Sequence, residues 1–132
     1  MKSLRFIIFN LFLSAVIFIG CAQTVNENAI TTDQLQEMME SDSNLVLLDV
    51  RNPHELKDKS LGHIDGVLNI PLPELEKRLG ELDKYKSKDI AVICRSGRRS
   101  GIATELLVKN GFNAINILGG MVEYRATENS NK

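Results

Sequence analysis

Cys94 lies in the part of this chain whose residue types are best suited to chemistry. It follows the apolar run 90–93, and the segment 95–100 after it reads RSGRRS. The run predicts a strand, and the apolar spacing of 102–109 predicts a helix. A cysteine between the end of a strand and the start of a helix meets free backbone N–H groups and the positive end of the helix dipole. Both favour the thiolate, which is the reactive form of cysteine.

Three arginines crowd the same turn, namely Arg95, Arg98 and Arg99. Their charge should favour the thiolate further, and with the backbone N–H groups they make the turn a cradle for a small anion. We therefore expect an ionised Cys94 inside a ring of amide hydrogens at the mouth of a covered sheet. Gly97 should supply a backbone conformation that a Cβ would hinder.

The composition is that of an ordinary single globular domain, with 43% hydrophobic and 25% charged residues. The formal net charge is −1. Without Lys2 and Arg5 the 16 basic residues fall to 14, against 17 acidic ones, and the net charge becomes −3. The chain has no basic excess, so we expect no nucleic-acid partner. The positive charge around Cys94 is local and suits a small anion.

The first 21 residues have the three-part layout of a secretory signal. Lys2 and Arg5 precede the apolar run 6–19, and Gly20 and Cys21 follow it. The run is shorter than the roughly 20 residues that span a membrane comfortably. Glycine followed by cysteine resembles a bacterial lipoprotein signal, in which the cysteine is lipidated and becomes the new N-terminus.

This resemblance predicts a signal peptide over 1–21 with cleavage before Cys21. The composition of the rest predicts a polar tether over 22–28, a domain over 29–127 and a polar tail over 128–132. The protein would then be exported to the cell envelope or periplasm and anchored to a membrane through lipid on Cys21. Two alternatives stay open at this point. The apolar run could be an uncleaved anchor, or cleavage could occur elsewhere and leave the Cys21 thiol free.

Cys21 and Cys94 are the only cysteines of the chain. Consumption of Cys21 by lipidation leaves one thiol, so the mature chain can form no internal disulfide. Neither cysteine belongs to a CxxC pair, and no His/Cys cluster has the spacing of zinc ligands. We expect no metal and no cofactor.

Strand-like and helix-like segments alternate after the tether. The segment 45–50 is a continuous apolar run that ends in an acid, which is typical of a strand covered on both faces. Further strands are predicted at 67–70, 90–93 and 114–118. Helices are predicted after a Thr31 cap, at 53–57, around 75–82, at 102–109 and at 121–125, with a frayed tail from Ala126. This order predicts an α/β fold with a mainly parallel sheet, in which ligands bind at the carboxyl ends of the strands.

Four blocks of sequence resemble, in order, a single-domain rhodanese, a sulfurtransferase. They are 47–55, 62–71, the loop after Cys94, and 119–121. The resemblance implies three layers, with helices on both faces of a central parallel sheet. It also implies a six-residue active loop that begins at Cys94, and a sulfane sulfur carried on that cysteine as a persulfide. The chain departs from the family at Tyr124, where tryptophan is common, and in extra length between Pro53 and Gly62.

The resemblance also assigns roles within the loop. Backbone N–H groups from about Arg95 to Ser100 should surround the persulfide. Arg95 occupies a position where the family often has arginine, so we assign it to the anionic donor, with Arg98 as second candidate. Arg99 has two open roles, either in the substrate site or in a structural pair beneath the loop with an acid such as Asp49. The full set of predicted substrate-binding residues is Arg95, Ser96, Gly97, Arg98, Arg99 and Ser100.

Residues outside the loop are expected to support it. Asp49 and Arg51 end a neighbouring strand and should brace the loop rather than touch substrate. His63 should hold its glycine-flanked turn by hydrogen bonds, because persulfide chemistry needs no histidine base once the thiolate exists. His54 and Glu55 are interpreted as helix-surface or ion-pair residues.

The predicted activity is thiosulfate sulfurtransferase-type transfer through Cys94. The donor would be a small sulfur-containing anion or a persulfide, and the acceptor a thiol or cyanide. A cysteine phosphatase or arsenate reductase is an alternative, but it needs arginine six positions after the cysteine, where this chain has Ser100. A non-catalytic binding module is a second alternative. A dithiol oxidoreductase is disfavoured because the mature chain has no resolving cysteine.

Overall fold

The fold is built on one five-stranded sheet in which every pair of neighbouring strands is parallel. The computed structural model describes residues 28–130, so the predicted leader and most of the tether lie outside the described residues. The strand order is β1-β5-β4-β2-β3, which places β4 at the centre. The strands are β1 (Ala29–Ile30), β2 (Val46–Asp49), β3 (Leu68–Asn69), β4 (Asp89–Ile93) and β5 (Asn113–Ile117).

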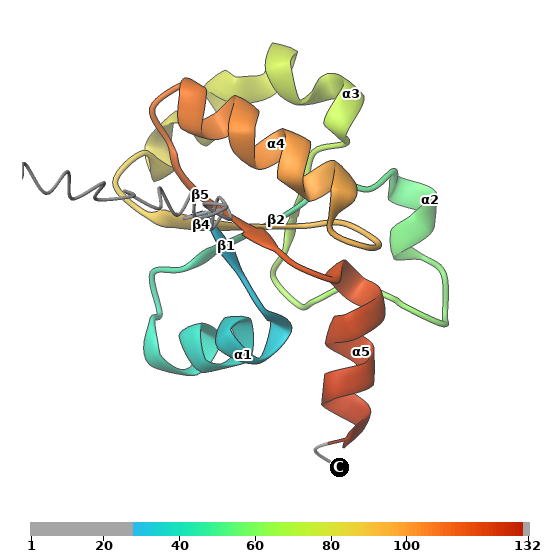
Figure 1. Cartoon of the computed structure of the whole chain (residues 1–132). Coiled ribbons are helices and arrows are strands. Elements are labelled where there is room, and N and C mark those ends of the chain that lie inside the picture. Colours follow the sequence, from blue (N-terminus) through green and yellow to red (C-terminus); the bar gives the residue numbers. More distant parts are fainter. Residues whose placement is uncertain (1–27, 131–132) are drawn as a thin grey trace, which may run out of the picture.

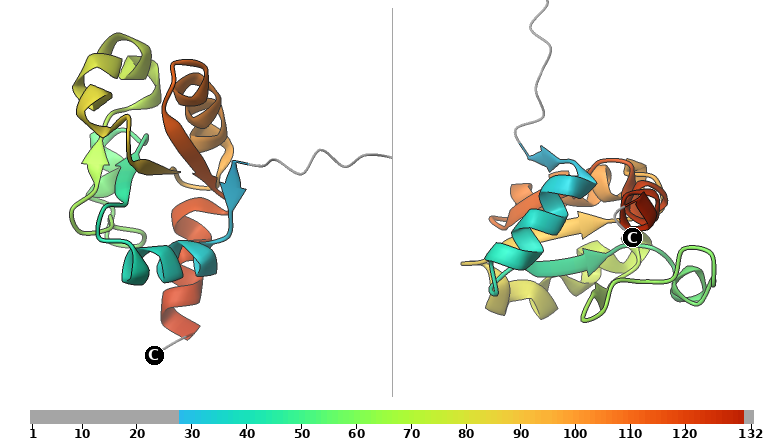
Figure 2. Two further views of the ribbon diagram at one scale, coloured as in Figure 1. Left: turned by 90° about the vertical axis from the view of Figure 1, so that its left-hand side faces the viewer. Right: turned by 90° about the horizontal axis from the view of Figure 1, so that it is seen from below.

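Helices cover both faces of this sheet, as the resemblance implied. They are α1 (Thr32–Ser41), α2 (Pro53–Leu56), α3 (Leu72–Leu75), the 3₁₀ helix η1 (Glu76–Tyr85), α4 (Arg98–Lys109) and α5 (Gly120–Ser130). Figure 1 shows α3 and α4 on one side of the sheet and α1 and α5 on the other. In the right-hand view of Figure 2 the strand arrowheads point toward the side where α2 and the start of α5 lie.

The central strand β4 separates two hydrophobic cores. Ile90, Val92 and Cys94 pack into the core beneath α3, η1 and α4. Ala91 and Ile93 pack into the core beneath α1 and α5. Successive side chains of a strand point to opposite faces, so a strand that is covered on both sides needs apolar residues throughout. This explains the continuous apolar run before Cys94 and places the cysteine on the α4 side.

Two predicted helix starts are confirmed by their caps. The Thr31 hydroxyl accepts a hydrogen bond from the Gln34 N–H, and the Gln34 side chain accepts one from the Thr31 N–H. At α2 the Glu55 carboxylate accepts from the Asn52 N–H at 3.0 Å. Such reciprocal capping satisfies backbone donors that the first turn of a helix leaves free.

The observed elements differ from the predicted ones in five places. Strand β1 and helix α3 were not predicted, and the segment around 75–82 is mostly 3₁₀ rather than α-helix. Helix α4 begins at Arg98 instead of 102, because Gly97 has a φ of +93° and turns the chain directly into the helix. Helix α5 continues to Ser130 instead of fraying from Ala126. Among residues 28–130, no helix is long and apolar enough to cross a membrane.

Candidate active site

Cys94 follows directly from the last residue of the central strand. Asp49 at the end of β2 is in register with Ile93 at the end of β4, and the Val50 N–H donates to the Ile93 carbonyl at 3.0 Å. The carboxyl ends of two neighbouring parallel strands therefore meet at the cysteine. This is the edge at which open parallel sheets place their ligand sites.

The Cys94 sulfur is surrounded by hydrogen-bond donors. The Gly97 N–H donates to Sγ at 3.1 Å, and the Ser100 hydroxyl donates at 3.3 Å. Burial opposes ionisation, but hydrogen bonds from the Ser100 hydroxyl and from the N–H groups of Ser100, Ser96 and Gly97 hold the pKa of the Cys94 thiol below its ordinary value. The thiolate is therefore favoured, as predicted.

The backbone N–H groups that lower the pKa of Cys94 are those that the sequence predicted, and the Ser100 hydroxyl adds to them. Of the three arginines, Arg99 has a charge interaction with Cys94. The position of the sulfur differs from the open mouth that we expected, since Cys94 is only 1% exposed. Arg95, Ser96 and Arg98 are exposed around this buried sulfur.

Gly97 occupies the point where the loop becomes helix α4. Its φ of +93° lies in the left-handed region, which an L-residue with a Cβ adopts rarely. A Cβ at this position would also lie 3.1 Å from the Gly119 nitrogen and 3.3 Å from the Ile117 oxygen. Both the backbone conformation and the lack of space for a Cβ therefore require glycine at this position, as predicted.

The start of α5 supports the loop from the other side. The Met121 N–H donates to the Cys94 carbonyl at 2.8 Å, and the Val122 N–H donates to the Arg95 carbonyl at 3.1 Å. A Cβ on Gly120 would lie 2.5 Å from that Cys94 oxygen. The free donors of a helix N-terminus are therefore used here to fix the backbone of the nucleophile.

Arg99 is engaged in a two-pronged ion pair. Its guanidinium donates to both carboxylate oxygens of Glu55, at 2.7 Å each. The hydrogen bond from Arg99 lowers the pKa of Glu55 to about 2, and the same contact raises the pKa of Arg99. Of its two open roles, the structure shows Arg99 in a structural pair, with Glu55 as the partner in place of Asp49. The pair joins α2 to the first turn of α4.

Asp49 forms an ion pair with Arg51, and both side chains are 1% exposed. The Asp49 carboxylate accepts from the Arg51 N–H, Nε and Nη2 at 2.7–3.0 Å. Arg51 also donates to the Gly62 carbonyl at 2.7 Å. The Asn69 amide donates to the carbonyls of Asp49 and Arg51 at 2.9 Å each. These contacts brace the strand ends and the turn at Gly62 around the loop.

His63 lies in a turn that is held mainly through its backbone. Its exposed ring places Nδ1 3.4 Å from the Leu56 carbonyl. Arg125 of α5 donates to the carbonyls of Leu61 and His63 at 2.7 and 2.8 Å. With the bond from Arg51 to Gly62, two arginines thus hold three consecutive carbonyls. The longer segment between Pro53 and Gly62 is anchored at this end.

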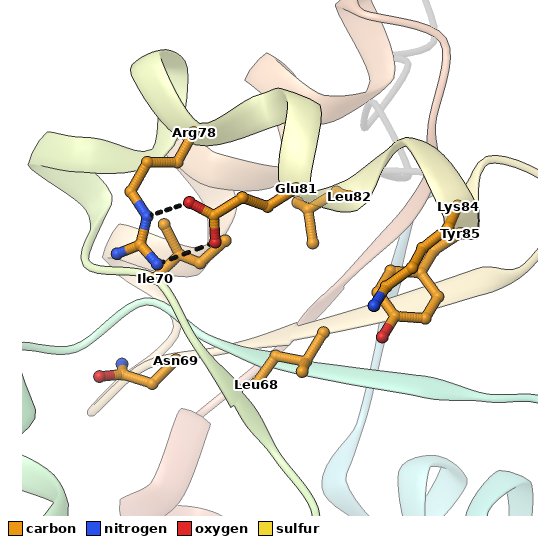
Figure 3. Close-up of a pocket in the computed structure, with 8 residues that line it drawn as sticks. All are labelled: Leu68, Asn69, Ile70, Arg78, Glu81, Leu82, Lys84 and Tyr85. Atoms are coloured by element: carbon orange, nitrogen blue, oxygen red, sulfur yellow. Dashed lines mark hydrogen bonds and ion pairs between the residues drawn. The ribbon is translucent and has the colours of Figure 1, made fainter.

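A pocket of about 480 Å³ opens elsewhere, between edge strand β3 and η1. Figure 3 shows its lining, in which the Arg78 guanidinium pairs with the Glu81 carboxylate above an apolar floor that includes Leu68 and Ile70. No residue of the 94–100 loop lines this pocket. Across residues 28–130, no three His, Cys, Asp or Glu side chains are grouped to hold a metal ion.

Three supporting features were not predicted in their observed form. The sequence placed Glu55 in a surface or ion-pair role without naming Arg99, which is 44 residues away. Ser100 was predicted to act through its backbone N–H, which does contact the Cys94 sulfur, but the additional hydrogen bond from its hydroxyl was not predicted. The contact of the α5 N-terminus with Cys94 was also missed. The glycine pair 119–120 was the available signal, since it predicted a tight turn near the site.

Comparison with known proteins agrees with this architecture. A family model described as "Rhodanese-like domain" matches residues 31–127. The chain is 40% identical over 96 residues to the "Putative sulfur carrier protein YrkF" of Bacillus subtilis, covering 72% of this chain. The chain spans about half the length of that relative, 49%. It is 35% identical over 95 residues to the "Putative sulfurtransferase YtwF" of the same organism, covering 72% of this chain and 87% of that protein.

A solved structure has the same fold. The rhodanese-related protein of Thermoplasma volcanium aligns with a TM-score of 0.66 at 33% identity, covering 76% of this chain and 92% of the other. The similarity therefore extends over nearly all of the residues that form the sheet and the cysteine loop.

Proposed function

This chain belongs to the rhodanese-like domain family, and we propose that it is a sulfurtransferase that carries a sulfane sulfur as a persulfide on Cys94. Relatives in this family are named sulfurtransferases or sulfur carriers. The observation that supports the proposal is the set of donors directed at one sulfur atom, from the Gly97 N–H and the Ser100 hydroxyl. Donors placed in advance around a developing negative charge stabilise it without reorganisation.

In the first step the Cys94 thiolate attacks the outer sulfur of a donor such as thiosulfate. A bond forms between Sγ and that sulfur, the sulfur–sulfur bond of thiosulfate breaks, and its electron pair leaves with sulfite. The product is a Cys94 persulfide anion, so the total charge is unchanged. The same donors that lower the pKa of the thiol would then hold the negative persulfide.

In the second step an acceptor attacks the outer sulfur of the persulfide. A thiol acceptor gives its proton to the transferred sulfur, and the electron pair of the breaking bond returns to Cys94 as thiolate. Cyanide would leave as thiocyanate in the same way. No external oxidant or reductant is needed in either step.

The test is mass spectrometry of the folded protein after treatment with thiosulfate. We expect one added sulfur on Cys94, removed by a thiol reductant and absent from Cys94→Ser. Because Cys94 is 1% exposed, the donor reaches the sulfur only when atoms around it move, so loading should be followed over time and with several donors. No adduct with any donor on a folded protein would contradict the proposal.

We assign the anionic donor to Arg95, with Arg98 as second candidate. Both side chains are exposed beside the loop, whereas the Arg99 guanidinium is paired with Glu55. Arg95→Ala should therefore weaken loading by thiosulfate more than loading by a neutral persulfide donor, by about tenfold for one charge-assisted contact. Arg98→Ala is the matched control, with a smaller effect expected. Equal losses with both donors would remove Arg95 from this role.

We also propose that the protein is exported and anchored to the cell envelope through lipid on Cys21. This proposal is supported by the charged, apolar and Gly20-Cys21 segments of the leader. Metabolic labelling with a radioactive fatty acid tests it. Label should appear on the wild-type protein and be lost in Cys21→Ala, whereas unchanged labelling would contradict the proposal.

A further inference from the structure

Two large apolar side chains are exposed on either side of the turn that supports the cysteine loop. Leu118 is 46% exposed and Val122 is 48% exposed. They flank Gly119 and Gly120, whose φ values of +73° and +57° make the turn between β5 and α5 tight. Exposed apolar residues are common singly. What distinguishes this pair is its attachment to the backbone of the nucleophile.

Both residues are fixed relative to the loop by backbone contacts. The Val122 N–H donates to the Arg95 carbonyl at 3.1 Å. A Cβ built on Gly97 lies 3.6 Å from the Leu118 Cα, which shows how closely these segments approach. The Leu118 N–H donates in turn to the Ile30 carbonyl at 2.9 Å. The backbone positions of Leu118 and Val122 are therefore fixed beside the loop, and both residues are exposed there.

Exposed cations lie on the same loop. Arg95 and Arg98 are exposed, and within residues 28–130 no side-chain hydrogen bond or ion pair holds either guanidinium. Asp58 is close enough to Arg95 for a charge interaction, and Glu123 is exposed one residue after Val122. The chain as a whole carries a net charge of −1. The loop thus presents positive charge and apolar surface together, on a protein that is otherwise mildly acidic.

We propose that Leu118, Val122, Arg95 and Arg98 form a docking surface, here called the loop-side patch, for a protein that carries a thiol among apolar and acidic residues. This inference rests on the proposed sulfurtransferase function and names its acceptor as a protein thiol. A small anion or cyanide would use the arginines but gain nothing from two half-exposed apolar side chains. A protein segment can bury both side chains while its carboxylates face the two arginines.

The transfer itself is the second step described above, with the partner's cysteine as acceptor. Its thiol attacks the outer sulfur of the Cys94 persulfide, its proton passes to that sulfur, and Cys94 leaves as thiolate. Because Cys94 is 1% exposed, the acceptor protein has to stay bound at the loop until its thiol reaches the persulfide sulfur. Docking beside the loop supplies that positioning.

The experiment uses short synthetic peptides as acceptors for protein preloaded with sulfur. One peptide carries a single cysteine between leucines with glutamates on both sides, a second has lysines in place of the glutamates, and a third has serines in place of the leucines. Free cysteine is the small acceptor. We expect the acidic, apolar peptide to accept sulfur about tenfold faster than free cysteine, because docking on the patch stabilises the complex before transfer. The other two peptides should be slower.

The matched variants are Leu118→Ser/Val122→Ser and Val108→Ser. Val108 is 41% exposed, but it lies near the end of α4 that points away from the loop. The rate with the acidic, apolar peptide divided by the rate with free cysteine should fall in the double variant to the value that the serine-containing peptide gives with the wild type, and it should stay unchanged in Val108→Ser. Equal rates with the peptide and with free cysteine in the wild type would overturn the loop-side patch. The same ratio in the double variant as in the wild type would also overturn it.

A binding measurement separates this inference from the proposed function. Cys94→Ser protein is titrated with a fluorescent peptide in which serine replaces the acceptor cysteine, so no chemistry occurs. Tighter binding of the acidic, apolar peptide, lost in the Leu118→Ser/Val122→Ser background, supports the patch even if Cys94 never takes up sulfur. Absence of such binding overturns the patch even if Cys94 loads normally with thiosulfate.

Discussion

At the scale of single residues, the reactivity of Cys94 depends on the hydroxyl group opposite its sulfur. Ser100 is fully buried, and its hydroxyl is the side chain that donates to Sγ. The remaining donors are backbone N–H groups of the loop and of the first turn of α4, which substitution leaves in place. Ser100 is therefore the position at which the ionisation of Cys94 can be changed without changing the backbone.

Ser100→Ala should raise the pKa of Cys94, because burial remains while the largest stabilising hydrogen bond is lost. A hydrogen bond to a charged group contributes about 1.5–3 kcal/mol, so alkylation of Cys94 at pH values below its pKa should slow by about tenfold or more. The measurement is the rate of reaction with iodoacetamide as a function of pH.

Ser96→Ala is the control for this experiment. Ser96 is exposed, and it acts on the Cys94 sulfur through its N–H rather than its hydroxyl. Its pH profile should match that of the wild type. If both serine variants gave the same profile, the hydroxyl of Ser100 would have no special role.

At the scale of secondary-structure elements, the Glu55–Arg99 pair ties α2 to α4. The pKa of Glu55 is about 2 in the folded protein, against an ordinary 4.5. A carboxyl with a lowered pKa stabilises the fold above its ordinary pKa, and this contribution is lost as the pH falls from about 4.5 toward about 2. This lowering of the Glu55 pKa corresponds to a contribution of about 3 kcal/mol at most to the free energy of unfolding. The side chains of Arg99 and Glu55 are 32% and 20% exposed, so screening by solvent reduces the contribution to about 1–2 kcal/mol.

Glu55→Gln should therefore lower the free energy of unfolding by about 1–2 kcal/mol at pH 7, and by less at pH 3. Urea unfolding at the two pH values measures this difference. Glu81→Gln is the matched control, because Glu81 also pairs with an arginine, Arg78, but is exposed on η1. A destabilisation by Glu55→Gln that was the same at both pH values would show that the lost charge is not its cause.

The contact between α5 and the loop leaves no room for a side chain at Gly120. A Cβ there would lie 2.5–2.7 Å from backbone atoms of Cys94 and Arg95. Gly120→Ala should lower the free energy of unfolding by about 3 kcal/mol or more, since backbone has to move. Thermal or urea unfolding measures this, and the loading of Cys94 by thiosulfate should fall with it.

Gly111→Ala provides the comparison, because Gly111 has a similar positive φ of +84° with nothing within 4 Å of its Cβ position. It should lose only the backbone term of about 1–2 kcal/mol. Similar losses at the two glycines would mean that backbone conformation, and not the approach to Cys94, explains the effect.

The elements themselves could largely be predicted, because periodicity and capping are local. The Thr31 and Asn52 caps and the apolar run before Cys94 identified α1, α2 and β4. The spacing of Leu75, Leu79 and Leu82 could not distinguish η1 from an α-helix, since it suits either. Strand β1 has two residues and is formed by pairing with β5. No local pattern is long enough to predict it.

The candidate site was predictable in its position but not in its contacts. Cys94 and the donors of its loop follow from a strand, a glycine and a helix in succession. The choice of Glu55 over Asp49 as the partner of Arg99 depends on how α2 packs, across 44 residues of sequence. The 1% exposure of Cys94 likewise depends on tertiary packing. These features follow from the assembled fold, so sequence spacing alone does not contain them.

At the scale of the whole molecule, the sheet is completed by the first residues that the structure describes. The Asn116 N–H donates to the Asn28 carbonyl at 2.7 Å, and the Leu118 N–H donates to the Ile30 carbonyl at 2.9 Å. The match to the family begins only at residue 31. The segment 28–30 nevertheless belongs to the folded domain, because it forms the edge of the sheet beside β5.

A fragment 31–132 should therefore be less stable than a fragment 28–132, by about 2 kcal/mol for the lost strand-pairing hydrogen bonds at about 0.5–1.5 kcal/mol each. Urea unfolding of the two fragments measures the difference. Removal of 130–132 from the longer fragment is a three-residue truncation at the other end, where Ser130 is exposed, and should have little effect. Equal stability of the 28–132 and 31–132 fragments would show that β1 contributes nothing.

Because α5 supports the Cys94 loop, the site is completed only after α5 has been synthesised. The ribosome releases β4 and its cysteine before β5 and α5 have been synthesised. A nascent chain that ends at Lys109 contains the thiol and its nearest donors, but it lacks the N–H groups that hold the carbonyls of Cys94 and Arg95. Truncated translation products thus carry an unsupported thiol, and the nucleophile matures only when the last part of the chain has emerged and folded.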